Sequence, residues 1–237
     1  MKRTFRLLIA LTGLAAADIA LAQMPPSPNV VASKAMTVSQ LRASNAALMH
    51  HYYWDTRTEI LVNGQVKDIR IDQVSFGPGG QLQKQLVNDQ PSSGFFLPTP
   101  IGFLRRAVAD HEKEEMQQYL AGLRTLLEQY TLPTTGKIMD FLASAATTTD
   151  PATGMFVITG NNIIQPGDSL TFMINTWTMH PAQVKVSTSF QGSPVSLTAS
   201  FKTLPSGLNY ADFAEASAPA KNLTVQVQNY NYTRLAN

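Results

Sequence analysis

The sequence predicts an α+β fold in which helices cover the concave face of a curved antiparallel sheet, an incomplete β-barrel. Two observations lead to this prediction. Between residues 162 and 232, four runs alternate apolar and polar side chains between glycine- or proline-containing turns, as antiparallel strands with one buried face do. Between residues 101 and 145, apolar side chains instead recur every three or four positions, which indicates helices that can cover that face.

The first 22 residues are typical of a secretory signal peptide. Three basic residues precede an apolar run, and Ala-Leu-Ala at 20–22 has the small-residue pattern of a cleavage site, so we expect cleavage before Gln23. Asp18 interrupts the apolar run, which is shorter than the ~20 residues that a membrane-spanning helix needs, so an anchor is disfavoured. We therefore expect a soluble protein exported to the periplasm.

The absence of cysteine and the charge balance exclude several classes of function. With no cysteine, the chain has no disulfide, no thiolate metal site and no lipid-modified cysteine, so it is not a bacterial lipoprotein. The signal segment carries three of the 18 basic and one of the 16 acidic residues, which leaves 15 of each. Because the mature chain is neutral, we expect no nucleic-acid partner and at most a peripheral contact with a membrane.

A disordered lead-in and a short helix are expected to follow the signal peptide. Residues 23–36 are proline-rich at their start and lack periodicity, which predicts a lead-in without regular structure. Residues 38–49 place Val38, Leu41, Asn45 and Leu48 on one side of a helix, and Thr37 is its expected cap.

The next unit is predicted to be a three-stranded meander. Aromatic and β-branched residues fill the run from 51 to 62, and Asn63-Gly64 supplies a type I′ turn to a partner strand at 65–76. The apolar phase of that partner shifts, which predicts a bulge near Asp72 or contact on both faces. A glycine-rich turn then leads to a third strand at 81–87.

Helices and a second group of strands complete the expected domain. A helix is predicted over 101–130, and a second helix begins near Pro133, with Ile138, Met139, Phe141, Leu142 and Ala145 on its apolar face. Residues 147–154 are interpreted as a turn, and about six strands follow to the end of the chain. We expect residues 37–237 to form one domain with a single sheet; two separate domains are the alternative.

The chain offers no recognisable catalytic or metal-binding pattern, so we expect that it is not an enzyme and has no cofactor. Its four histidines lack the spacing of a zinc site, and neither a serine-nucleophile elbow nor a phosphate-binding loop occurs. The acidic group at 110–115 is interpreted as a solvated helix face. Arg57 is expected on the face opposite Trp54, paired across strands with Asp68 or Asp72.

One side of the predicted sheet is apolar, and this side is the candidate ligand-binding surface. It has two interpretations: the residues pack against the helices as an ordinary core, or they line a cavity for an apolar ligand. The alternation of residues does not separate the two. The candidates are Tyr52, Trp54, Ile60, Phe172, Ile174, Val186, Phe190, Leu197 and Phe201.

The order of these elements resembles the LolA/LolB-like superfamily of bacterial envelope proteins. The resemblance rests on an N-terminal helix, the Tyr-Tyr-Trp-Asp-Thr-Arg-Thr-Glu strand at 52–59 with its Asn-Gly turn, central helices, and a β-meander after Pro166-Gly167-Asp168. It covers roughly residues 38–232. It implies an incomplete barrel closed by helices, with an apolar cavity that carries the acyl chains of lipoproteins.

Two functions are therefore expected from the sequence. The first is an exported binding protein that carries or senses lipid, acyl chains or lipoproteins in the periplasm. The second is a structural or protein-interaction domain of the cell envelope with a filled core and no ligand. A hydrolase is a distant third, because no catalytic constellation can be named.

Overall fold

The structure, a computed structural model, describes residues 28–90, 102–131, 134–150, 152–178 and 180–235. The predicted signal peptide therefore lies outside the described residues. The described elements are α1 (Pro28–Met49), β1 (Tyr52–Val62), β2 (Gln65–Phe76), β3 (Leu82–Gln90), α2 (Gly102–Gln129), α3 (Thr135–Ser144), β4 (Ala146–Thr149), β5 (Met155–Asn161), β6 (Ser169–Asn175), β7 (Pro181–Phe190), β8 (Ser193–Thr203), β9 (Asn209–Ala218), a short 3-10 turn (Pro219–Lys221) and β10 (Leu223–Arg234).

The described strands form one ten-stranded antiparallel sheet in the order β3-β2-β1-β10-β9-β8-β7-β6-β5-β4. Every neighbouring pair is a hairpin except β1 and β10, which come from opposite ends of the chain and pair from Tyr52↔Arg234 to Val62↔Leu223. The predicted meander therefore extends the C-terminal strands in one sheet. β3 and β4 are its two edges, so the sheet is curved but not closed.

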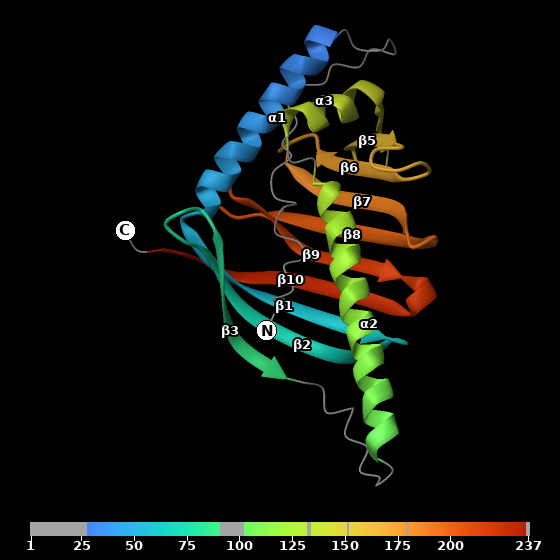
Figure 1. Cartoon of the computed structure of the whole chain (residues 1–237). Coiled ribbons are helices and arrows are strands. Elements are labelled where there is room, and N and C mark those ends of the chain that lie inside the picture. Colours follow the sequence, from blue (N-terminus) through green and yellow to red (C-terminus); the bar gives the residue numbers. More distant parts are fainter. Residues whose placement is uncertain (1–27, 91–101, 132–133, 151, 179, 236–237) are drawn as a thin grey trace.

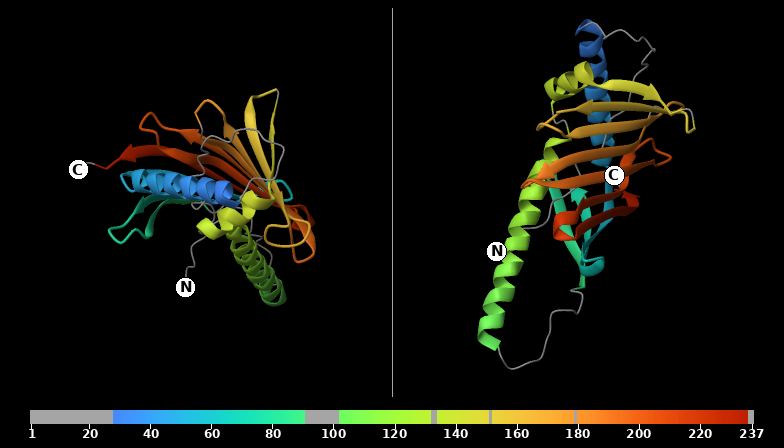
Figure 2. Two further views of the ribbon diagram at one scale, coloured as in Figure 1. Left: turned by 90° about the horizontal axis from the view of Figure 1, so that it is seen from above. Right: turned by 90° about the vertical axis from the view of Figure 1, so that its right-hand side faces the viewer.

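The helices lie on the concave side of the sheet. Figure 1 shows α2 crossing in front of the strands, and the view from above in Figure 2 shows α1 running within the curve of the sheet. The N-terminal part of α2 projects beyond the strands. This arrangement confirms the predicted α+β fold, with a curved antiparallel sheet covered on one side by helices.

Alternation along the strands produces the two sides of the sheet. In β8, Val195, Leu197 and Ala199 are buried, whereas Ser196 and Thr198 between them point to the convex side. The main core of buried apolar residues lies on the concave side, between sheet and helices. It comprises Val38, Tyr119, Leu120, Leu123, Leu127, Tyr130, Ile138, Phe141, Phe156, Ile158, Leu170, Phe172, Ile174, Val184, Val186, Val195, Leu197, Ala199, Phe201, Ala211, Ala214, Ala216, Ala218, Leu223, Val225 and Val227.

Several local predictions are confirmed. Asn63 and Gly64 both have positive φ, 54° and 71°, as a type I′ turn requires. The ladder between β2 and β3 shifts register between Ile71 and Asp72, where the sequence predicts a bulge, and the extra residue, Val87, lies on β3. The strands β5 to β10 follow the alternating runs and their turns.

Other local predictions are wrong. The first helix begins at Pro28, so residues 28–36 are helical and Thr37 lies within the helix instead of capping it. Residues 146–149 form the edge strand β4 rather than a turn, because pairing with β5 recruits a threonine-rich segment that has no apolar face of its own. Met139, predicted on the apolar face of α3, is 37% exposed.

Asn45 attaches α1 to the sheet by a reciprocal pair of hydrogen bonds. Its Nδ2 donates to the carbonyl oxygen of Asn209 at 2.8 Å, and its Oδ1 accepts from the Asn209 amide at 2.9 Å. The Asn45 side chain thus makes the two backbone hydrogen bonds that a neighbouring strand would otherwise make at the start of β9. In the middle of α1, the hydroxyl of Ser39 lies 2.9 Å from that of Thr135, which joins α1 to α3.

We expect Asn45→Ala to lower the free energy of unfolding by about 1–3 kcal/mol, because both groups of the Asn209 backbone lose a buried partner. Chemical denaturation measures this change, and hydrogen exchange should show faster exchange in α1. Ser44→Ala is the matched control, since Ser44 is an exposed neighbour on the same helix and should change stability by less than about 0.5 kcal/mol. Equal stability of the two variants would contradict the prediction.

Asp168 joins the C-terminal end of α2 to the turn between β5 and β6. Its carboxylate accepts from the amides of Ile163, Ile164 and Gln165 at 2.6, 2.9 and 2.9 Å, and from the Tyr130 hydroxyl at 2.6 Å. Burial raises the pKa of Asp168, but these hydrogen bonds outweigh it and hold the pKa below its ordinary value. The turn between β5 and β6 therefore also anchors the end of α2.

Among the helices that the structure describes, none is both long enough and apolar enough to cross a membrane.

Candidate functional site

The nine predicted site residues divide between two clusters on the concave side. Tyr52 and Trp54 belong to a small cluster beside the end of α1, whose buried members are Met49, Tyr52, Trp54, Val74 and Leu208. Five others lie in the main core, and Ile60 and Phe190 are partly buried against it. The structure therefore brings all nine to one side of the sheet, but not into one group.

The main core is in direct contact with α2 and α3. The ring of Phe141 meets that of Phe172 edge to face, with centroids 5.4 Å apart, and Tyr119 meets Phe190 in the same way at 5.1 Å. A Cβ atom at Gly122 would lie 2.7 Å from Cζ of Phe190, so the glycine permits this close approach of α2. These contacts are those of a packed core.

A strip of polar side chains lies on the same side of the sheet, across β10, β1 and β2. Thr56 pairs in register with Asn229 on one side and Asp72 on the other. The Thr56 hydroxyl donates to Asn229 Oδ1 at 2.7 Å. Arg70 binds both carboxylate oxygens of Asp72 at 2.7 Å, and Asp72 is only 2% exposed. We call Thr56, Asn229, Asp72 and Arg70 the polar strip.

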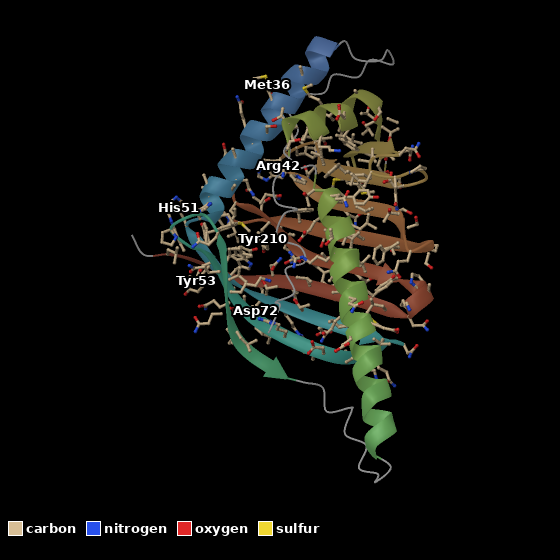
Figure 3. The ribbon with its side chains drawn as sticks, viewed as in Figure 1. Met36, Arg42, His51, Tyr53, Asp72 and Tyr210 are labelled. Carbon is tan, nitrogen blue, oxygen red and sulfur yellow. The ribbon has the colours of Figure 1, made fainter. Side chains whose placement is uncertain are left out.

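Arg42 brings a further charge to the concave side. It lies on the side of α1 that faces the strands, whereas Met36 lies on the opposite side (Figure 3). Burial lowers the pKa of the Arg42 guanidinium, which remains protonated near neutral pH. The concave side thus carries cationic as well as apolar groups.

The predicted pairing of Arg57 with Asp68 or Asp72 is wrong. In the β1–β2 register, Arg57 is opposite Ile71, while the two aspartates are opposite Ile60 and Thr56. Adjacent strand residues point to opposite faces, so both aspartates lie on the concave side and Arg57 on the convex side. Arg57 instead forms an ion pair with Glu59 on its own strand.

Aromatic rings gather where β9 and β10 separate, and we call Tyr52, Trp54, Tyr210 and Tyr232 the aromatic corner. The Trp54 and Tyr232 rings are stacked, with centroids 5.5 Å apart and planes 8° apart. Tyr210 contacts Tyr232 at 4.2 Å, and Tyr52 contacts it edge to face at 6.5 Å. Figure 3 labels Tyr210 in this part of the sheet, beside the C-terminal half of α1.

The histidines and acidic residues form no site among the described residues. His50 stacks on Phe76 with ring centroids 4.3 Å apart, and His180 Nδ1 lies 2.8 Å from the Thr203 hydroxyl. Glu114 and Glu115 are exposed, while the side chains at 110–113 lie outside the described ones. Within the described part of the chain, no group of three or more potential metal ligands is found.

Sequence reasoning missed the polar strip, Arg42 and two rings of the aromatic corner. A signal for the strip was present in the alternation. Thr56 and Asn229 each lie two residues after an apolar residue that points to the concave side, where a buried polar side chain needs a hydrogen-bond partner. Tyr232 gave a weaker signal. An extra residue in β10 just before Tyr232 reverses the alternation of side chains between the two sides of the sheet, so the pattern upstream does not predict where Tyr232 points. Arg42 gave none, because the docking of α1 could not be predicted.

No protein-family model matches the chain, and no curated protein matches it in sequence. Comparison of structures finds a DUF1329 family protein from Desulfovibrio piger, with 8% identity and a TM-score of 0.38, covering 87% of this chain and 92% of that chain. It also finds a putative outer membrane lipoprotein-sorting protein domain from Vibrio parahaemolyticus, with 8% identity and a TM-score of 0.39, covering 86% and 94%.

Proposed function

We propose that this chain is an exported binding protein, without enzymatic activity, whose concave side holds an amphipathic ligand. The ligand class is a lipid, an acyl chain or the acylated part of a lipoprotein. Apolar chains would lie against the apolar residues of the sheet, and the polar part of the ligand would lie toward the polar strip. The chain would act in the periplasm after removal of residues 1–22.

The observation that carries this proposal is the buried polar strip on an otherwise apolar side. A surface whose only role is to pack against helices gains little from an ion pair, because desolvation of the two charges offsets their attraction. Here Asp72 is 2% exposed and paired with Arg70, and the strip lies between the two apolar clusters. An apolar surface interrupted by oriented polar groups is the usual composition of a small-molecule site.

A second candidate is a structural or protein-interaction domain with a filled core. The contacts of Phe141 with Phe172 and of Tyr119 with Phe190 favour it, because they occupy the apolar side with helix residues. Under this second candidate, the polar strip would serve only to fix the pairing and register of the strands.

Native mass spectrometry of the protein purified from an envelope fraction tests the proposal. We expect co-purified lipid, displacement of a bound fluorescent fatty acid by added lipid, and a mature mass that begins at Gln23. Absence of both lipid and displacement would refute the binding function and favour the second candidate. As a control for specific contact, Arg57→Gln on the convex side should leave displacement unchanged.

A further inference from the structure

We propose that the aromatic corner binds the uncharged carbonyl group of an acyl ester, with Trp54 Nε1 and the Tyr232 hydroxyl as its hydrogen-bond donors. This inference rests on the proposed function and specifies where one group of the ligand, its ester carbonyl, is held, two residues along β1 from Thr56 of the polar strip. It concerns the end of the sheet beside α1, away from the contacts of α2 and α3.

The backbone opens the sheet at this corner. The β9–β10 ladder ends at the pair Gln228↔Phe213, but β10 continues along β1 as far as Arg234. Beyond that pair, Asn229 Nδ2 donates to the carbonyl oxygen of Ala211 at 2.8 Å, so a side chain takes the place of the ladder. The aromatic corner lies where the two strands have separated.

Two polar atoms of the corner are buried without a hydrogen-bond partner. They are Trp54 Nε1, in a side chain that is 0% exposed, and the hydroxyl oxygen of Tyr232. A buried polar group without a partner costs about 1–3 kcal/mol, so two in one cluster are exceptional. The indole nitrogen only donates, so its partner has to be an acceptor.

The charges around the corner favour an uncharged acceptor. Burial raises the pKa of Tyr232, and the neighbouring Tyr210 and Asp212 raise it further. Near neutral pH only Asp212 of these neighbours is charged, and its carboxylate opposes a second carboxylate. Lys202 is paired with Asp212 at 3.0 Å, so its ammonium group is already engaged. An ester carbonyl accepts hydrogen bonds without charge, and the apolar residues around the corner, such as Met49 and Leu208, suit an attached acyl chain.

Tryptophan fluorescence tests the position of the ligand. The chain has two tryptophans, Trp54 and the 92% exposed Trp177, so Trp177→Phe leaves Trp54 as the single reporter. We expect a brominated monoacylglycerol to quench Trp54 and to bind more tightly than the brominated fatty acid of the same chain length. In this background, Tyr232→Phe should weaken ester binding about tenfold, the effect of one lost hydrogen bond. Tyr230→Phe, on the same strand, should leave it unchanged.

Stability provides an independent readout. Because the Tyr232 hydroxyl has no partner in the protein, Tyr232→Phe should keep or raise the Tm of the ligand-free protein while weakening ester binding. Equal ester affinity of Tyr232→Phe and its parent, tighter binding of the fatty acid, or lipid binding without quenching of Trp54 would each overturn the inference and leave the proposed function standing. Failure to bind any lipid would remove both.

Discussion

Asp168→Ala is expected to lower the free energy of unfolding by about 3–5 kcal/mol. The substitution leaves the amides of residues 163–165 and the Tyr130 hydroxyl without their shared acceptor in a site that is 2% exposed. Chemical denaturation measures the loss. Asp150→Ala is the matched control, because Asp150 also organises a hairpin turn but is more exposed, and we expect a clearly smaller loss of stability.

The same carboxylate gives the protein a dependence on acid. The pKa of Asp168 is lower in the folded state than its unfolded value of about 3.9, so its stabilising contribution is complete above that value. The contribution is lost as pH falls through the folded pKa. Asp168→Asn should therefore have a flatter stability profile below about pH 4 than the parent. An identical acid profile would show that other carboxylates dominate.

Phe172→Ala is expected to lower the free energy of unfolding by about 3–5 kcal/mol, as for other buried aromatic residues. Phe172 is 4% exposed and meets Phe141 of α3, so truncation leaves a cavity between helix and sheet. Met173→Ala is the control on the opposite side of β6, with an expected loss below about 1 kcal/mol.

The Phe172 variant also shows whether the main core takes part in ligand binding. If the main core is filled, added lipid displaces the fluorescent fatty acid from the variant as it does from the parent, when both are measured well below their Tm. A small loss of stability together with altered displacement would instead show that Phe172 contacts the ligand.

The sheet could be predicted well because its signals are local. Alternation indicated which side of β6, β7, β8 and β10 is buried, and Asn63-Gly64 indicated the first hairpin. The helical start at Pro28 could not be predicted, because the composition of residues 28–36 does not indicate a helix and the packing of α1 against α3 is a tertiary contact. The strand β4 was missed because it depends on pairing with β5 and has no apolar face of its own.

The candidate site was predicted less completely than the fold. The sequence correctly indicated which apolar residues point to the concave side. The grouping of Trp54 with Tyr232, however, depends on the pairing of β1 with β10. The pairing of Asp72 with Arg70 instead of Arg57 depends on the register of β1 and β2. Register and long-range pairing are tertiary properties, which short patterns do not specify.

The pairing of β1 with β10 also has a consequence for the order of folding. Thr56 and Asn229, which share a hydrogen bond, are 173 residues apart, so a very long loop closes when these strands meet. Sheets with such distant contacts fold in milliseconds to seconds rather than microseconds. Until β10 arrives, the meander presents β1 as an unpaired edge. A chain truncated within β10 should therefore aggregate, even though every residue of the meander is present.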